Sequence, residues 1–137
     1  MKVFVLRKLD LKECHADICG VYSEEGKKKA LDSFVDKQKE LNKKQIHDIE
    51  LNIASQKKER ADLTAIDNEL LVRAGKKLNT VEMRLHDHYM QQIEDLTNSI
   101  ATLNEHKNTI LASSDEQLAA DYMAGYNLMF KEFELQW

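Results

Sequence analysis

The pattern of hydrophobic and polar positions predicts strands near the two ends of the chain. Residues 2–9 read Lys-Val-Phe-Val-Leu-Arg-Lys-Leu, a β-branched and aromatic run that is typical of a strand. Residues 16–22 predict a second strand, joined to the first as a hairpin by a polar connection. Phe133, Leu135 and Trp137 alternate with polar residues, which favours a third strand, with a helix running to the terminus as the alternative.

Between these strands the apolar residues recur mostly three, four or seven positions apart, which is the spacing of a helix face. Ser23 offers an N-cap for a helix over residues 24–74, and Gly75 offers its C-terminal stop. Asn79 with Glu82 resembles a capping box, so a second helix is expected from about residue 80 to 112. The apolar positions of the first helix are Leu31, Phe34, Leu41, Ile46, Ile49, Ile53, Leu63, Ile66 and Leu70.

The second helix carries the seam of a coiled coil, with one lysine in it. The seam residues are Tyr89, Ile93, Leu96, Ile100, Leu103, Lys107 and Ile110. Segments 43–74 and 80–112 are nearly equal in length, so we expect an antiparallel hairpin in which position numbers that sum to about 154 lie opposite. The pairs expected from this register are Arg60 with Glu94 or Asp95, and Asp67 with His86 or His88.

A third, short helix is expected over residues 115–124, because Ser114 and Gln117 form another capping box and Gly125 follows. The predicted fold class is therefore α+β: a small antiparallel sheet from both chain ends plus a long antiparallel helical, coiled-coil hairpin. We expect a single domain of residues 1–137, in which 1–42 and 113–137 form the sheet and its packing helices and 43–112 form the hairpin.

Composition supports extended helices with much solvated surface, since 42% of residues are hydrophobic, 32% are charged and proline is absent. Residues 24–77 carry 13 basic and 11 acidic groups, whereas residues 78–137 carry 3 and 10, and opposite signs favour pairing between the two segments. Each lysine run is offset by nearby acids, so nucleic acid is not an expected partner.

A cytoplasmic location is expected. The N-terminus shows no secretory signal pattern, and no run of apolar residues is long enough to span a membrane, so no membrane association is expected. Cys14 and Cys19 are the two cysteines, and we expect both thiols to be free.

The two ends of the chain resemble a class of small bacteriophage and bacterial proteins, mostly of unassigned function, that have a β-hairpin, a helix and a final strand. The likeness lies in Lys2 to Leu6, in Ile18 to Glu25, which leads into a lysine- and alanine-bearing helix, and in Tyr126 to Leu135. The hairpin of residues 43–112 departs from that pattern as an insertion. The resemblance implies a phage accessory protein, acting in the host cytoplasm in counter-defence or host takeover, which binds and inhibits a host protein or sequesters a small signalling molecule.

Candidate chemistry is sparse. Cys14, His15 and Cys19 lack the second ligand pair that a structural zinc needs, so we expect no metal. His86 and His88, on either side of Asp87, point to different sides of a helix. His47 and His106 stand opposite in the register and could form a pH-sensitive pair, although coincidence is the simpler interpretation. No phosphate loop, nucleophile elbow or Walker sequence occurs, so we expect neither an enzyme nor a cofactor.

Basic residues gather around the predicted tip of the hairpin, where they either complement helix ends or bind an anion or a protein. The candidate ligand- or partner-binding residues are Arg60, Arg73, Lys76, Lys77, Arg84, His88 and Tyr89. Gln56, Arg60 and Lys107 interrupt the apolar seams, where polar groups specify register or line a polar pocket.

The first strand is apolar on both faces, and one of them needs a cover. Either Val3 and Val5 or Phe4 and Leu6 are expected at the interface of a homo-oligomer. The functional hypothesis is a non-enzymatic protein that binds a host factor through its hairpin. The alternatives are an oligomeric sponge for an anionic nucleotide, held by arginines and Tyr89, and a structural coiled-coil spacer.

Overall fold

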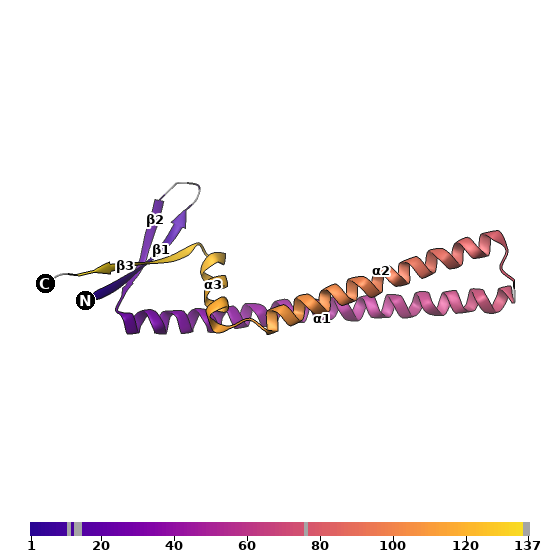
Figure 1. Ribbon diagram of the computed structural model, residues 1–137, viewed down its shortest axis with the longest axis horizontal. Helices are drawn as coiled ribbons and strands as arrows, with labels where there is room; N and C mark the ends of the chain where they lie inside the picture. Colours follow the sequence, from indigo (N-terminus) through magenta and orange to yellow (C-terminus); the bar gives the residue numbers. More distant parts are fainter. Residues whose placement is uncertain (11, 13–14, 76, 136–137) are drawn as a thin grey trace. The chain divides into compact units, whose positions relative to one another are not determined.

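The computed structural model describes residues 1–10, 12, 15–75 and 77–135 of the chain. It shows the expected α+β fold, with a small sheet from both chain ends and a pair of long helices (Figure 1). In chain order the elements are β1 (Lys2–Asp10), β2 (His15–Tyr22), α1 (Glu24–Ala74), α2 (Thr80–Leu111), α3 (Asp115–Gly125) and β3 (Leu128–Glu134). These elements form two compact units, Met1–Lys44 with Ser113–Trp137 and Gln45–Ala112, and α1 contributes to both.

The sheet of the first unit has the order β2-β1-β3, with both neighbours antiparallel to β1. The prediction of a third strand near the C-terminus is confirmed, although β3 begins at Leu128, earlier than the alternating pattern showed, and Trp137 lies outside the described residues. The pairing of β1 with β2 shifts between Leu6 and Arg7, because Cys19 is an extra residue on β2.

One face of the sheet packs on the first turns of α1. Phe4 and Leu6 are buried on this face, so it is the inward face of the first strand. The Lys27 ammonium lies 4.3 Å from the centre of the Phe4 ring, and Phe34 packs 6.4 Å from Phe130 of β3. Residues near the start of α1 therefore cover the sheet, as the sequence predicted.

α3 completes the core of this unit. Ser114 caps it by accepting a hydrogen bond from the Gln117 amide at 3.2 Å, as the sequence predicted. The Gln117 side-chain amide donates to Asp121, and among the described residues no bond runs from the Ser114 amide to the Gln117 side chain, so the predicted capping box is only half formed. The buried residues Val35, Leu118 and Ala119 form a cluster with Leu31, and Phe34 stacks on Tyr122 at 5.0 Å.

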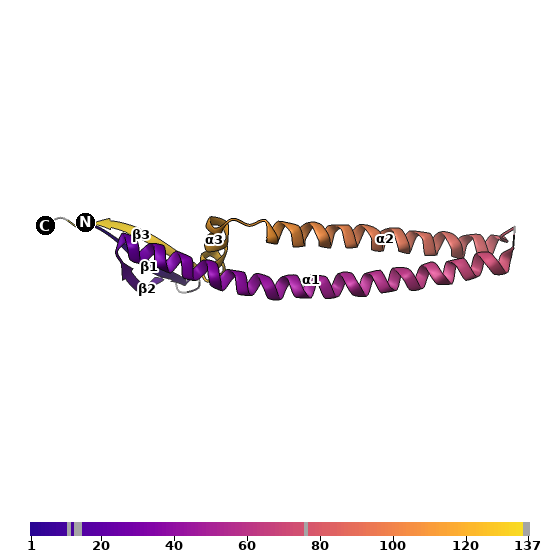
Figure 2. The ribbon, with the colours of Figure 1, turned by 90° about the horizontal axis from the view of Figure 1, so that it is seen from below.

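The second unit is an antiparallel helical hairpin, in which α2 runs back along α1 (Figure 2). Its buried centre is Ile49, Ile53 and Ile100, with Leu103 and Ile110 packed against them. α1 ends at Ala74, and Gly75 follows with a φ of 68°, a left-handed conformation that glycine adopts without steric cost. The predicted capping box is present, since Asn79 and Glu82 exchange side-chain to backbone hydrogen bonds of 2.8 and 3.1 Å.

The contacts between α1 and α2 confirm one expected pair and correct another. His86 Nδ1 lies 2.7 Å from Asp67 Oδ1, as predicted. Arg60 instead donates to the Thr97 hydroxyl at 3.2 Å, so its expected pairing with Glu94 or Asp95 is wrong. Residues that face the other helix recur every three or four positions. The position numbers of opposite residues therefore do not add up to the same total along the whole hairpin. The seam lysine Lys107 pairs with Glu50 at 3.1 Å.

No helix in the described part of the chain is long and apolar enough to cross a membrane.

Candidate functional site

The end of the helical hairpin exposes an unusual set of apolar side chains. Val72 in the last turn of α1 is 82% exposed, and Val81 and Met83 at the start of α2 are 72% and 53% exposed. Leu71 and Leu85 are also exposed beside them. We call residues 66–89 the hairpin end. Grouped apolar side chains at a surface most often mark an interaction site, because removing their surface from water on binding is favourable.

The middle of the hairpin end, residues 71–85, is positively charged, whereas residues 66–89 as a whole carry four basic and four acidic residues. Residues 71–85 contain four basic residues and one acid, Glu82, whose carboxylate is held by the backbone amide of Asn79. Arg73 lies at the C-terminus of α1, where the helix dipole favours a cation. The exposed Arg84 lies in the second turn of α2, near a positive helix end, so the dipole does not explain its position.

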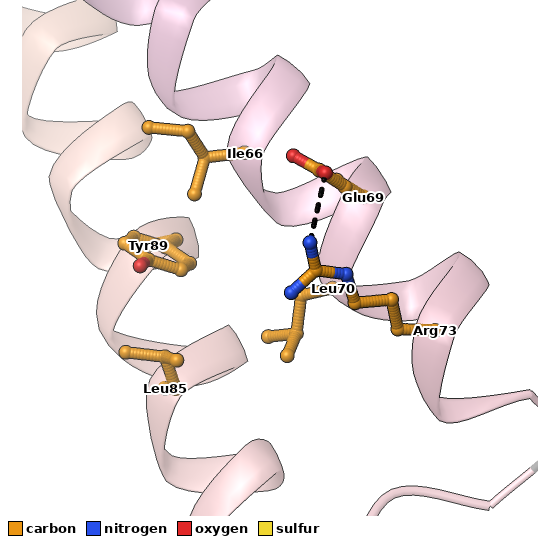
Figure 3. A pocket seen from close by; sticks show the side chains of 6 residues that line it. All are labelled: Ile66, Glu69, Leu70, Arg73, Leu85 and Tyr89. Carbon is orange, nitrogen blue, oxygen red and sulfur yellow. Dashed lines mark hydrogen bonds and ion pairs between the residues drawn. The ribbon is translucent and has the colours of Figure 1, made fainter.

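A hollow of about 160 Å³ lies between α1 and α2 at the hairpin end (Figure 3). Its wall combines apolar and aromatic side chains with one exposed ion pair. The residues that line it are Ile66, Glu69, Leu70 and Arg73 from α1, and Leu85 and Tyr89 from α2. Figure 3 shows the Arg73 guanidinium turned toward Glu69, to which it donates a hydrogen bond at 3.2 Å.

This hollow suits one apolar side chain that carries an acidic group beside it. Ile66, Leu70 and Leu85 offer an apolar wall, and Tyr89 adds an aromatic ring. The pair between Arg73 and Glu69 is solvent-exposed, and such i,i+4 pairs contribute only about 0.3–0.5 kcal/mol. Arg73 can therefore exchange Glu69 for an incoming carboxylate at little cost.

A hydrogen bond between the Asp67 and His86 side chains joins the two helices at this point. Asp67 is only 4% exposed, and His86, its partner at 2.7 Å, is half-buried. Asp67 follows Ile66 of the hollow in the chain, and His86 follows Leu85. The pair therefore sets how the two walls of the hollow face each other.

The structure brings some of the predicted binding residues together and separates others. Arg73 and Tyr89 line the same hollow. The His88 ring lies 6.3 Å from that of Tyr89, and Lys77 is exposed in the connection from α1 to α2. Arg60 is 13 residues from Arg73, about 20 Å along α1, and does not belong to this site. Lys76 lies outside the described residues.

The histidines and cysteines that were considered, and rejected, as metal ligands are placed as follows. No group of three His, Cys, Asp or Glu side chains in the described part of the chain is arranged to hold a metal ion. Cys14 lies outside the described residues, and Cys19 is a free, exposed cysteine. His47 and His106 are both exposed.

Sequence reasoning missed the apolar part of the site. Leu85 stands four residues before Tyr89 and next to His86, which holds the seam position, so its spacing from Tyr89 could have revealed it. Val72, Val81 and Met83 lie off the seam, and an excess of off-seam apolar residues on both sides of Gly75 was the available signal.

No protein-family model matches the chain, and no curated protein or solved structure matches it either. The function is therefore argued from its own residues.

Proposed function

We propose that the chain is a non-enzymatic binding protein that engages a partner protein through its hairpin end. The partner surface is an apolar segment that carries acidic side chains. The observation that carries this proposal is the exposure of Val72, Val81 and Met83 within a segment that has four basic residues and one acid. Burying these side chains against a partner gains about 25 cal/mol per Å² of apolar surface.

The hairpin end supports binding in two ways. The hollow accepts one apolar side chain of the partner, while Lys77 and Arg84 meet acidic groups around it and Arg73 at its rim takes a carboxylate. Both walls stand on long helices held by the Asp67–His86 pair, so little ordering is needed when the partner arrives.

The resemblance of the chain ends to small bacteriophage and bacterial proteins indicates what kind of partner to expect. The partner is then a host protein in the cytoplasm, and occupation of its surface by the hairpin inhibits it. Neither step needs a cofactor or a catalytic group.

Co-purification from the cells that naturally make the protein tests the proposal. The test variant combines Val72→Ser with Val81→Ser, and the matched control combines Leu51→Ser with Leu111→Ser, which are 57% and 62% exposed elsewhere in the same unit. We expect the wild type and the control to retain one stoichiometric partner that the test variant loses. Retention of that partner by the test variant, or absence of any partner from the wild type, contradicts the proposal.

The second candidate, binding of an anionic nucleotide, draws support from the position of Arg73 and Tyr89 in one hollow, where a guanidinium and an aromatic ring could hold a phosphate and a base. A thermal-shift screen with nucleotides decides between the two. A nucleotide at 100 times its dissociation constant adds about 2.7 kcal/mol of stability. Our proposal predicts no shift, and a shift that Tyr89→Ala removes would favour the nucleotide.

A further inference from the structure

The sheet of the first unit has an open face opposite the one that packs on α1. Val3, Val5 and Arg7 of β1 point away from the buried Phe4 and Leu6, because side chains alternate along a strand. Their antiparallel partners point to the same side. We call this surface the open sheet face, and its residues are Val3, Val5, Arg7, Ile18, Val21, Met129, Lys131 and Phe133.

An irregularity in β2 enlarges the apolar part of this face. Ile18 and Val21 are three residues apart, so in a regular strand they would point to opposite faces. The extra residue Cys19 shifts the pairing, so that Ile18 lies opposite Arg7 and Val21 lies opposite Val5. Both side chains therefore join the open face, where they are 69% and 63% exposed.

Among the described residues, neither charge on this face is paired with an acidic side chain. Arg7 donates one long hydrogen bond, 3.8 Å, to the Met129 sulfur, and its Nε has no acceptor among the described residues. A thioether is a weak acceptor, so the guanidinium is poorly satisfied. The Lys131 ammonium lies 5.4 Å from the centre of the Phe133 ring. None of the eight residues of the face is acidic.

These charges decide between two occupants of the face. Stacking it on a second copy would bring the Arg7 and Lys131 side chains of both copies together without a carboxylate, and like charges at an interface cost several kcal/mol. A partner with acidic side chains would instead supply the acceptor that Arg7 lacks. Charge complementarity therefore favours an acidic partner over a homo-oligomer on this face.

The dimensions of the face indicate the form of that partner. Two strand spacings of about 4.8 Å make a three-stranded sheet about 10 Å wide between its outer strands. A helix with its side chains is about 10–12 Å across, and helices are the usual second cover of such a sheet. One helix thus fills the open face.

We propose that the open sheet face is a second binding surface, which takes an acidic amphipathic helix of a partner protein. The leucines or isoleucines of that helix cover Val5, Ile18 and Val21, and one of its carboxylates pairs with Arg7. This surface belongs to a different unit from the hairpin end, and the inference does not depend on the function proposed for the hairpin.

A displayed library of helical peptides tests the proposal with the full chain. The peptides carry leucine at every core position of one helix face and random residues elsewhere. We expect selection to enrich Asp and Glu beside the leucines, and the selected peptides to bind at least tenfold more weakly to Arg7→Gln and Lys131→Gln. The control Lys29→Gln, on an exposed part of α1, and the hairpin variant Val72→Ser with Val81→Ser should bind as the wild type does.

Three results would overturn the inference. The first is that no peptide is enriched, and the second is that enriched peptides are basic or bind Arg7→Gln unchanged. The third comes from sedimentation of the protein alone: a dimer that Val21→Lys dissociates would show that a second copy covers the face. We expect Val21→Lys to leave the sedimentation coefficient unchanged.

Discussion

Asp67 and His86 form a hydrogen-bonded pair that crosses the hairpin, with 2.7 Å between Oδ1 and Nδ1. The carboxylate is buried, and the imidazole is half-buried. The pair occupies a place where the coiled-coil pattern would put apolar side chains. Because each member satisfies the other only when the helices are aligned, the pair selects one register of α1 against α2.

The cost of breaking this pair should be strongly non-additive. His86→Leu leaves a buried carboxylate without its partner, and we expect a loss of about 3–5 kcal/mol in the free energy of unfolding. Asp67→Leu should cost less, because the half-buried His86 retains access to water. The double variant should lie within about 1 kcal/mol of the wild type. Denaturant unfolding followed by circular dichroism measures all three, and single losses that simply add in the double variant would refute the coupling.

Gly75 and Gly125 should respond with opposite sign to the same substitution. An added Cβ meets nothing within 4 Å at either position, so packing does not distinguish them. Gly75 has a φ of 68°, and Gly75→Ala should cost about 1–2 kcal/mol through the left-handed backbone. Gly125 lies in the last turn of α3 without a positive φ, and Gly125→Ala should be neutral or stabilise by about 0.4–1 kcal/mol. Equal losses of unfolding free energy would argue against the left-handed turn.

Two neighbouring positions on α1 test where the hairpin core lies. Ile53 is buried with Ile49 and Ile100, whereas Leu51 is 57% exposed. We expect Ile53→Ala to reduce the unfolding free energy by about 2–5 kcal/mol. Leu51→Ala should change it by less than about 0.5 kcal/mol. If thermal unfolding shows the two variants to be alike, the seam has been placed on the wrong side of α1.

The cap of α2 should contribute measurably to the stability of the hairpin. Asn79→Ala removes the acceptor of the Glu82 amide, and we expect a loss of about 1 kcal/mol. Asn98→Ala, the same change at an exposed position inside α2, should not destabilise, since alanine is the better helix former. The same denaturant titration compares them, and a loss in Asn98→Ala as large as that in Asn79→Ala would remove the role of the cap.

Lys2 joins β1 to β3 through an ion pair whose effect depends on pH. The hydrogen bond and charge of Glu132, 3.3 Å away, raise the pKa of Lys2 above its ordinary value of 10.5. A raised pKa contributes stability that is present below the unfolded value and is lost as pH rises through the folded value. Titration of Lys2 by NMR should give a lower pKa in Glu132→Gln, and an unchanged pKa would argue against the pair.

Local signals in the sequence predicted much of this fold, because they act within a few residues. Ser23, Asn79 and Ser114 cap the helices where the sequence placed them, as the short-range bonds of their side chains require. The spacing of the apolar residues also predicted that Asp67 and His86 lie opposite each other on the two helices, and they are in contact. The partner of Arg60 was predicted wrongly, because it depends on how the side chains of the two helices interlock. The position numbers alone do not give that information.

The sites needed tertiary information. The sequence showed that β1 is apolar on both faces, but the packing of Phe34 and Lys27 decides that Phe4 and Leu6 face inward. The extra residue in β2 depends on strand pairing and was not visible in the spacing. At the hairpin end, the basic residues were visible in the sequence, while the exposure of Val72, Val81 and Met83 required the structure.

The most direct test of the proposed function is hydrogen–deuterium exchange on the purified complex of the chain with its co-purified partner. The amides of residues 66–89 should exchange more slowly in the complex than in the free protein, while those of residues 45–60, in the same hairpin, should not change. Protection confined to residues 45–60, or to β1, β2 and β3, would place the partner elsewhere and contradict binding by the hairpin end.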